Sequence, residues 1–158
     1  MRLFRSSEIL GIAAETLSFA LDAAADTHPD EYMGLLRGEP ARDLGLDRDG
    51  TVITDVLVIP GTRASPRGAT FQSNLVPNDL GSLGSVHSHP NGVLEPSDTD
   101  VASFGRGKVH VIMGAPYGRD DWRAFDRDGQ PAELDVLDVD LPDPAERFFD
   151  FDEADLDL

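Results

Sequence analysis

The sequence predicts a single α/β domain of the α+β layered kind, built on one mixed β-sheet flanked by helices. Three observations support this fold class. Apolar residues recur at helical spacing over residues 6–25. Several later runs are short and either apolar or β-branched, and turns rich in glycine, proline, asparagine and aspartate separate them. The length of 158 residues is enough for one sizeable core. We therefore expect one domain over 1–141, followed by an acidic tail over 142–158.

The elements follow from these patterns in chain order. Ser6 or Ser7 can cap the first helix, and Thr27-His28-Pro29 ends it. A polar connection over 42–50 ends in Asp-Arg-Asp-Gly, which is typical of a hairpin turn. The remaining elements are strands over 31–37, 51–59, 69–76 and 83–89, a short helix over 99–104, and strands over 108–113, 122–126 and 134–141.

Residues 87–100 hold the residue types of a hydrolytic metal site. His87 and His89 alternate on an extended strand, so their side chains share one face and can converge on one ion. Pro90-Asn91-Gly92 breaks the strand and turns the chain back. Ser97 then reads as the N-cap of a helix, and Asp100 in its first turn becomes the third ligand.

Two neutral imidazoles and one carboxylate leave a fourth tetrahedral position for water, which is typical of a catalytic zinc site. Each part of the pattern also has a simpler interpretation. A His-x-His pair is often two surface histidines, and Ser-x-x-Asp is a variant of the capping box found on many helices. The combination after one tight turn favours the metal site.

The stretch closely resembles the signature of the JAMM (MPN-plus) metalloprotease family, His-x-His, seven residues, Ser-x-x-Asp. Pro90 to Pro96 supply the seven residues, so the spacing is met without gaps. The family also has an upstream glutamate on an early strand, which Glu31 matches 56 residues before His87. The resemblance implies a curved mixed sheet similar to that of cytidine deaminase. It implies Glu31 and Ser97 as catalytic residues, beside one zinc ion per chain held by His87, His89 and Asp100.

The resemblance further implies an isopeptidase that removes ubiquitin-like small archaeal modifier proteins from the lysines of target proteins. Glu31 would act as the base, and the Ser97 hydroxyl would hold the oxyanion, in competition with its role as a helix cap. Two alternatives stay open. One is a zinc hydrolase of the same fold acting on small-molecule or sulfur-carrier adducts, and the other is a non-catalytic MPN scaffold. Whether the chain is a monomer or a homodimer is left open as well.

Composition excludes several function classes. Thirty acidic residues against 13 basic ones give a formal net charge of −17, and Lys108 is the one lysine. Without a basic stripe we expect neither nucleic-acid binding nor attraction to an anionic membrane. No run is apolar and long enough for a transmembrane helix, and no signal-peptide core follows the N-terminus, so we expect a cytoplasmic protein. The lack of cysteine leaves His and carboxylate as metal ligands.

The residues outside the motif carry weaker signals. His28 is interpreted as a loop histidine, and a role in supporting the metal ligands stays open. His110 is interpreted as a core or sheet-face histidine in a buried strand. Arg63 and Arg67 in the loop 60–68 can guide an acidic partner or be solvated. The phenylalanines of the tail can pack on the domain or bind a neighbour: Phe148, Phe149 and Phe151.

The first prediction concerns salt. The spread of acids along the chain and the near absence of lysine resemble the proteins of halophilic archaea. Molar salt shortens the Debye length to about 3 Å and so screens the repulsion among carboxylates. We expect the melting temperature to rise with salt and the protein to be unstable at low salt. A thermal denaturation series across salt concentrations measures this, and a melting temperature indifferent to salt would count against it.

Overall fold

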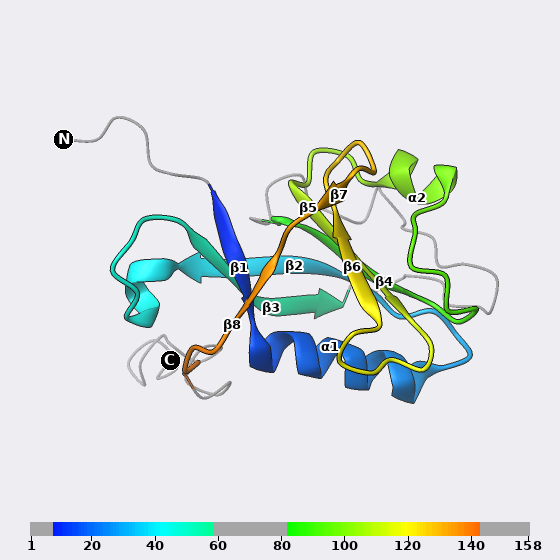
Figure 1. Ribbon diagram of the computed structural model, residues 1–158, viewed down its shortest axis with the longest axis horizontal. Coiled ribbons are helices and arrows are strands. Elements are labelled where there is room, and N and C mark those ends of the chain that lie inside the picture. The colour runs from blue at the N-terminus through cyan, green and yellow to red at the C-terminus, as the bar shows by residue number, and fades with distance from the viewer. Residues whose placement is uncertain (1–7, 59–81, 143–158) are drawn as a thin grey trace, which may run out of the picture.

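The computed structural model describes residues 8–58 and 82–142 of the chain (Figure 1). These residues form eight strands in one mixed sheet, in the order β7-β6-β5-β4-β2-β3-β1-β8. The strands are β1 (Ile9–Ala13), β2 (Met33–Pro40), β3 (Thr51–Val58), β4 (Gly84–His89), β5 (Val109–Gly114), β6 (Trp122–Phe125), β7 (Pro131–Ala132) and β8 (Asp135–Leu137). The helices are α1 (Ala14–Thr27), α2 (Asp98–Ser103) and a 3-10 turn over Ala41–Leu44.

The predicted fold class is confirmed. Strand β1 runs parallel to β3 and β8, β4 runs parallel to β5, and the other neighbouring pairs are antiparallel. The register shifts once between β1 and β3 and once between β2 and β3. Such shifts bend strands and increase their twist, which suits a curved sheet. Strand β4 lies inside the sheet, between β2 and β5, and is therefore held along both edges.

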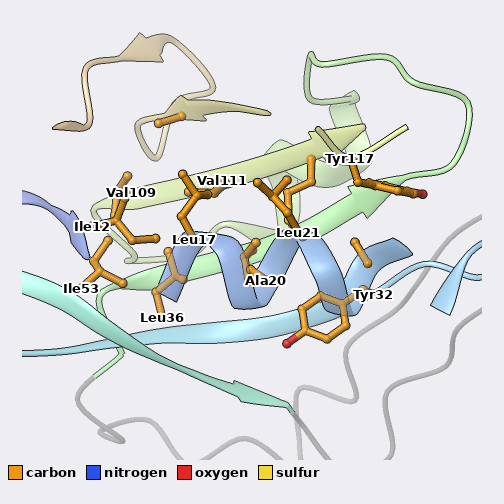
Figure 2. Close-up of a cluster of buried hydrophobic side chains, with 14 residues drawn as sticks. Ile12, Leu17, Ala20, Leu21, Tyr32, Leu36, Ile53, Val109, Val111 and Tyr117 are labelled. Carbon is orange, nitrogen blue, oxygen red and sulfur yellow. The ribbon is translucent and has the colours of Figure 1, made fainter. Parts of the chain in front are cut away.

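The two α-helices lie against opposite faces of this sheet (Figure 1). Helix α1 buries its apolar side in the main core, and Figure 2 shows Leu17 and Leu21 of α1 in one cluster with Val109 and Val111 of β5. The alternate residue Ile112 belongs to a separate cluster on the other face, with Phe104 beyond α2 and Phe125 of β6. Strand β5 thus divides its side chains between two cores.

One predicted element is wrong at its start. The helix expected over 6–25 begins only at Ala14, because residues 9–13 form strand β1. The N-cap is Ala13, with no side-chain hydrogen bond, while Ser6 and Ser7 lie outside the described residues. An apolar run with strand partners on both edges has no single polar face, so its periodicity does not separate strand from helix.

Other differences are at the edges of the sheet. The two-residue strand β7 was not predicted, and β8 spans three residues where a strand over 134–141 was expected. Short edge strands depend on their neighbours more than on their own sequence. The predicted loop over 60–68, the strand over 69–76 and nearly all of the tail, from residue 143 on, lie outside the described residues.

Neither α1 nor α2, nor any other helix within residues 8–58 and 82–142, is long and apolar enough to cross a membrane.

Among the described glycines, the closest approach of another backbone is at Gly84, at the start of β4, and it leads to a prediction. A Cβ atom built on Gly84 would overlap the carbonyl oxygen of Val109, which is backbone and has little freedom to move. We expect Gly84→Ala to push β4 and β5 apart and to cost about 1–3 kcal/mol of unfolding free energy or more. Chemical denaturation measures the loss.

Gly118→Ala is the matched control for this variant. Its Cβ would meet only the side-chain oxygen of Asp121, at 3.0 Å, and a side chain on a turn can move. Equal stability of the two variants would show that the β4–β5 contact does not need glycine.

Candidate metal centre

Three potential metal ligands from two elements converge on one point. The Nε2 atom of His87 lies 3.1 Å from Oδ1 of Asp100, and the Nε2 atom of His89 lies 3.0 Å from Oδ2 of the same carboxylate. The two Nε2 atoms are 3.1 Å apart. One ligand atom from each residue can be chosen so that all three lie within 4.8 Å of one another. The predicted ligand set His87, His89 and Asp100 is therefore brought together by the fold.

Strand β4 fixes the two imidazoles. In the strand ladders His87 pairs with Met33 of β2 on one side and with Ile112 of β5 on the other. Alternation along β4 sets Ser88 on the opposite face, and His87 and His89 on the face of the site. The His87 side chain is 2% exposed and that of His89 13%. The strand therefore presents one deeply buried donor and one partly accessible donor.

The turn after β4 and the start of α2 deliver the carboxylate. The side chain of Asn91 accepts a hydrogen bond from the Val93 amide, and Gly92 has a φ of 82°, which suits glycine. Ser97 is the N-cap of α2, as predicted, and forms a full capping box with Asp100. The Asp100 amide donates to Ser97 Oγ at 3.0 Å, and the Ser97 amide donates to Asp100 Oδ2 at 2.8 Å.

The tautomer of His89 is set by a backbone carbonyl. Its Nδ1 atom lies 2.7 Å from the carbonyl oxygen of Val93, and a carbonyl can only accept, so Nδ1 carries the proton. The lone pair of neutral His89 is then on Nε2, the atom that faces Asp100 and His87. A ring nitrogen oriented in this way by a carbonyl behind it is the usual state of a metal-binding histidine.

The charges of the site favour a bound cation. Burial opposes ionisation of Asp100, yet the hydrogen bonds that His87 and His89 donate when Nε2 is protonated hold the pKa of this carboxyl far below its ordinary value. Burial likewise disfavours charge on His89, but Asp100, the Val93 carbonyl and Glu31 outweigh it, so the pKa of His89 is raised. A carboxylate that stays ionised beside two imidazole nitrogens attracts positive charge, and a proton or a metal ion can supply it. Two nitrogens and one carboxylate oxygen fit the donor preferences of zinc.

Glu31 lies just before β2 and is buried, with 9% of its surface exposed. The neighbouring Tyr32 is clamped to β4 by two hydrogen bonds: the Tyr32 amide donates to Ser88 Oγ at 2.8 Å, and the Ser88 amide donates to the Tyr32 carbonyl at 2.9 Å. Since Met33 pairs with His87, extending this register by two residues sets Glu31 beside His89 on the same face. The charge of Glu31 also acts on His89, which agrees with this proximity.

Sequence reasoning missed the clamp between Tyr32 and Ser88. Ser88 points away from the metal ligands, and its side chain is fully buried on that other face. A buried serine needs a hydrogen-bond partner, so its position between two candidate ligands was a usable signal. Its partner could not be named, because the pairing of β2 with β4 joins residues 56 positions apart.

The other two histidines lie apart from the ligand set. His28 follows α1 as its C-cap, and its Nδ1 atom lies 2.8 Å from the hydroxyl of Tyr117. His110 is a buried histidine of β5, 1% exposed, as the sequence indicates, and hydrogen-bonds Ser85 and Gly107. Burial lowers the pKa of His110 to about 4, so its ring is neutral near pH 7.

Two histidines of β4 and a carboxylate of α2 meet on one face of a mixed sheet, which is a donor set typical of metal-dependent enzymes, and comparison with known proteins identifies the family. A family model described as halobacterial JAB/MPN domain protein matches residues 10–146. A Haloferax volcanii protein named "Probable metalloprotease" is 64% identical over 157 residues, which cover 99% of this chain and 97% of that protein.

Solved structures agree with this. A JAB1/MPN domain protein from Archaeoglobus fulgidus has a TM-score of 0.59 at 29% identity, covering 81% of this chain and 99% of that one. A structure described as "JAMM: A Metalloprotease-like Zinc Site in the Proteasome and Signalosome" has a TM-score of 0.58 at 28% identity, covering 82% and 99%. A Desulfitobacterium hafniense protein, at 20% identity and a TM-score of 0.59 over 82% of this chain and 93% of its own, shares the fold.

The chain belongs to the JAB/MPN (JAMM) family, and the model that it matches is that of the halobacterial members. Family, donor set and structural neighbours together support a metal-dependent hydrolase of the JAMM type.

The geometry predicts the effect of Asp100→Asn. The side-chain oxygen of asparagine can still accept from the Ser97 amide, so the helix cap is kept while the negative charge is lost. We expect zinc affinity to fall by more than the roughly 10- to 100-fold typical of losing an outer hydrogen-bond partner of a metal site. Competition with a chromogenic chelator measures the dissociation constant.

Asp98→Asn is the matched control, since Asp98 is an exposed acid in the same first helical turn. It removes an equal charge and should leave zinc affinity within about twofold, because exposed charges are strongly screened in molar salt. Equal loss in the two variants would mean that the overall charge, and not a ligand, attracts the metal.

Proposed function

We propose that this protein is a zinc-dependent isopeptidase that removes ubiquitin-like small archaeal modifier proteins from lysine side chains of target proteins. The observation that carries the proposal is the convergence of His87, His89 and Asp100 beside a buried glutamate on the same face of the sheet. The similarity to a protein named a probable metalloprotease and to a structure described as a metalloprotease-like zinc site supports the hydrolytic part. The substrate class rests on the family resemblance of the motif.

The residues present suit one zinc ion per chain, held by His87, His89 and Asp100. When bound, zinc supplies Lewis acidity, which lowers the pKa of water towards about 7 and polarises a carbonyl group. The partial exposure of His89 and Asp100, 13% and 16%, keeps one side of the ligand set accessible to water and substrate. A closed structural site would bury all its ligands.

Glu31 is assigned the general base. Its carboxylate accepts a proton from the attacking water and later passes this proton to the departing lysine amine, so it is regenerated in each turnover. The clamp between Tyr32 and Ser88 restrains the backbone next to Glu31 and so limits where its carboxylate can reach. A base of this kind contributes about 10² to 10⁴-fold, provided that it stays within hydrogen-bond reach.

Ser97 is assigned the oxyanion donor. The capping interaction uses a lone pair of Ser97 Oγ, which accepts from the Asp100 amide, and a hydroxyl has one proton to donate as well. Capping therefore uses a lone pair of the Ser97 hydroxyl, and oxyanion binding would use its proton. The two roles do not compete for the same atom. Loss of one such donor typically costs about 3–4 kcal/mol of transition-state stabilisation.

The experiment is cleavage of a modifier conjugated to a protein lysine, in molar salt, with the zinc content of each sample recorded. We expect the wild type to release the modifier, and Glu31→Gln to keep its zinc while losing about 10² to 10⁴-fold in turnover, because the amide cannot accept the proton. Glu39→Gln, at the other end of β2, is the control that should retain activity.

Two outcomes would count against the proposal. A zinc-loaded wild type that leaves the conjugate intact favours hydrolysis of a small-molecule or sulfur-carrier adduct. A Glu31→Gln variant that still cuts at the wild-type rate removes Glu31 from the mechanism.

A further inference from the structure

His110 occupies the face of the sheet that carries the metal ligands. Ser85 and His87 are two residues apart on β4 and share a face. In the parallel ladder Ser85 pairs with His110, and His87 pairs with Ile112. His110 therefore lies on the metal side of the sheet, although the mechanism does not use it.

Both ring nitrogens of His110 are engaged. The Nε2 atom lies 3.0 Å from the carbonyl oxygen of Gly107, which can only accept, so Nε2 carries the proton. The Nδ1 atom, 2.7 Å from Ser85 Oγ, then accepts from the hydroxyl. Because each ring nitrogen has a hydrogen-bond partner, rotation of the imidazole about its side-chain axis would break both bonds. The imidazole ring of His110 is therefore neutral and is held in one orientation.

The His110 ring packs against the C-terminal end of α2. The ring of Phe104, the C-cap residue of α2, stacks on His110 with centroids 3.9 Å apart and planes inclined by 4°. The Gly107 amide donates to the Phe104 carbonyl at 3.2 Å, so the Gly107 carbonyl bound by His110 belongs to the same turn. His110 therefore contacts this turn twice, by stacking and by hydrogen bonding.

Helix α2 needs such an anchor. It has six residues, none of them buried, and a helix this short is not stable by itself. Phe104, 4% exposed, follows it directly and packs with Ile112 and Phe125, and Val101 is partly buried against them. The helix is thus held at its C-terminal end, and its N-terminal end carries Ser97 and Asp100.

We propose that His110 is a positioning residue of the metal centre. Ser85 and Gly107 hold its ring, and the ring packs against Phe104. This contact keeps α2 in the position where Asp100 faces His87 and His89. The inference rests on the proposed function only in taking these three residues as the zinc ligands. Phenylalanine at this position would keep an aromatic ring to stack on Phe104. It would leave the Ser85 hydroxyl and the Gly107 carbonyl without their ring partners, so the ring would no longer be held in one orientation.

The test compares wild type, His110→Phe, the milder Ser85→Ala, and Val111→Ala, all in molar salt. For each protein we would measure the zinc dissociation constant by chelator competition, the metal-free melting temperature, and the visible spectrum of the cobalt-loaded form. Val111→Ala is the matched control. Val111 lies on β5 next to His110 and is equally buried, at 1% exposed, but it packs in the main core on the opposite face.

We expect His110→Phe to raise the zinc dissociation constant about 10- to 100-fold and Ser85→Ala to raise it by a smaller factor. The cobalt spectrum of His110→Phe should shift towards that of the Asp100→Asn variant introduced above, which reports the loss of the carboxylate ligand and is measured alongside. Val111→Ala should lower the metal-free melting temperature and leave the dissociation constant within about twofold, because its cavity lies in the other core.

Two results would overturn the proposal in different ways. If His110→Phe and Ser85→Ala bind zinc as tightly as wild type while melting at lower temperature, His110 is structural only, whatever the protein cleaves. If the wild type binds no zinc, the proposed function and this role of His110 fall together. Tight zinc binding that is weakened by His110→Phe, without cleavage of any modifier conjugate, supports the positioning role and contradicts the isopeptidase.

Discussion

The carboxylate of Asp100 carries two sets of interactions at once, and the site depends on both. One oxygen accepts the Ser97 amide at 2.8 Å and closes the capping box of α2, while the same group lies 3.0–3.1 Å from the two imidazoles of β4. The capping hydrogen bond orients the Asp100 carboxylate and leaves it ionised, because amide donors favour the charged form of a carboxyl group. Helix start and metal ligand are therefore one structural feature, which explains why a short exposed helix can deliver a well-oriented ligand.

The rest of the fold supplies two fixed supports for that contact. Strand β4 is bonded along both edges, to β2 and to β5, so the imidazoles cannot shift relative to the sheet. Helix α2 is attached through Phe104 and the small cluster with Ile112 and Phe125, on the face away from α1. The main core beneath α1 thus stabilises the sheet, and the smaller cluster sets the geometry of the ligands. Changes in the first should affect stability, and changes in the second should affect metal binding.

Much of the site could be predicted from local sequence. Two histidines at alternate strand positions share a face by geometry alone, and Ser97 followed by Asp100 is a local capping pattern, so these interactions join residues at most 13 positions apart. The helix over 6–25 was mispredicted at its start for an equally physical reason. Residues 9–13 become a strand because β3 and β8 offer hydrogen bonds on both sides, and neither neighbour can be identified from the run itself.

The sequence by itself determined that the metal donors are imidazole and carboxylate groups and that no thiolate takes part. It also determined the order of the elements from β4 through the turn to α2. Strand alternation, turn residues and helix caps each act over a few residues, so a local pattern is enough to show them. Only the tertiary structure decided that Tyr32 hydrogen-bonds Ser88 beside Glu31. It also decided that His110, hydrogen-bonded to Ser85, stacks on Phe104 on the metal face. These contacts depend on which strands pair and in which register. That choice is made by the burial of apolar side chains on both faces of the sheet, and no local pattern contains it.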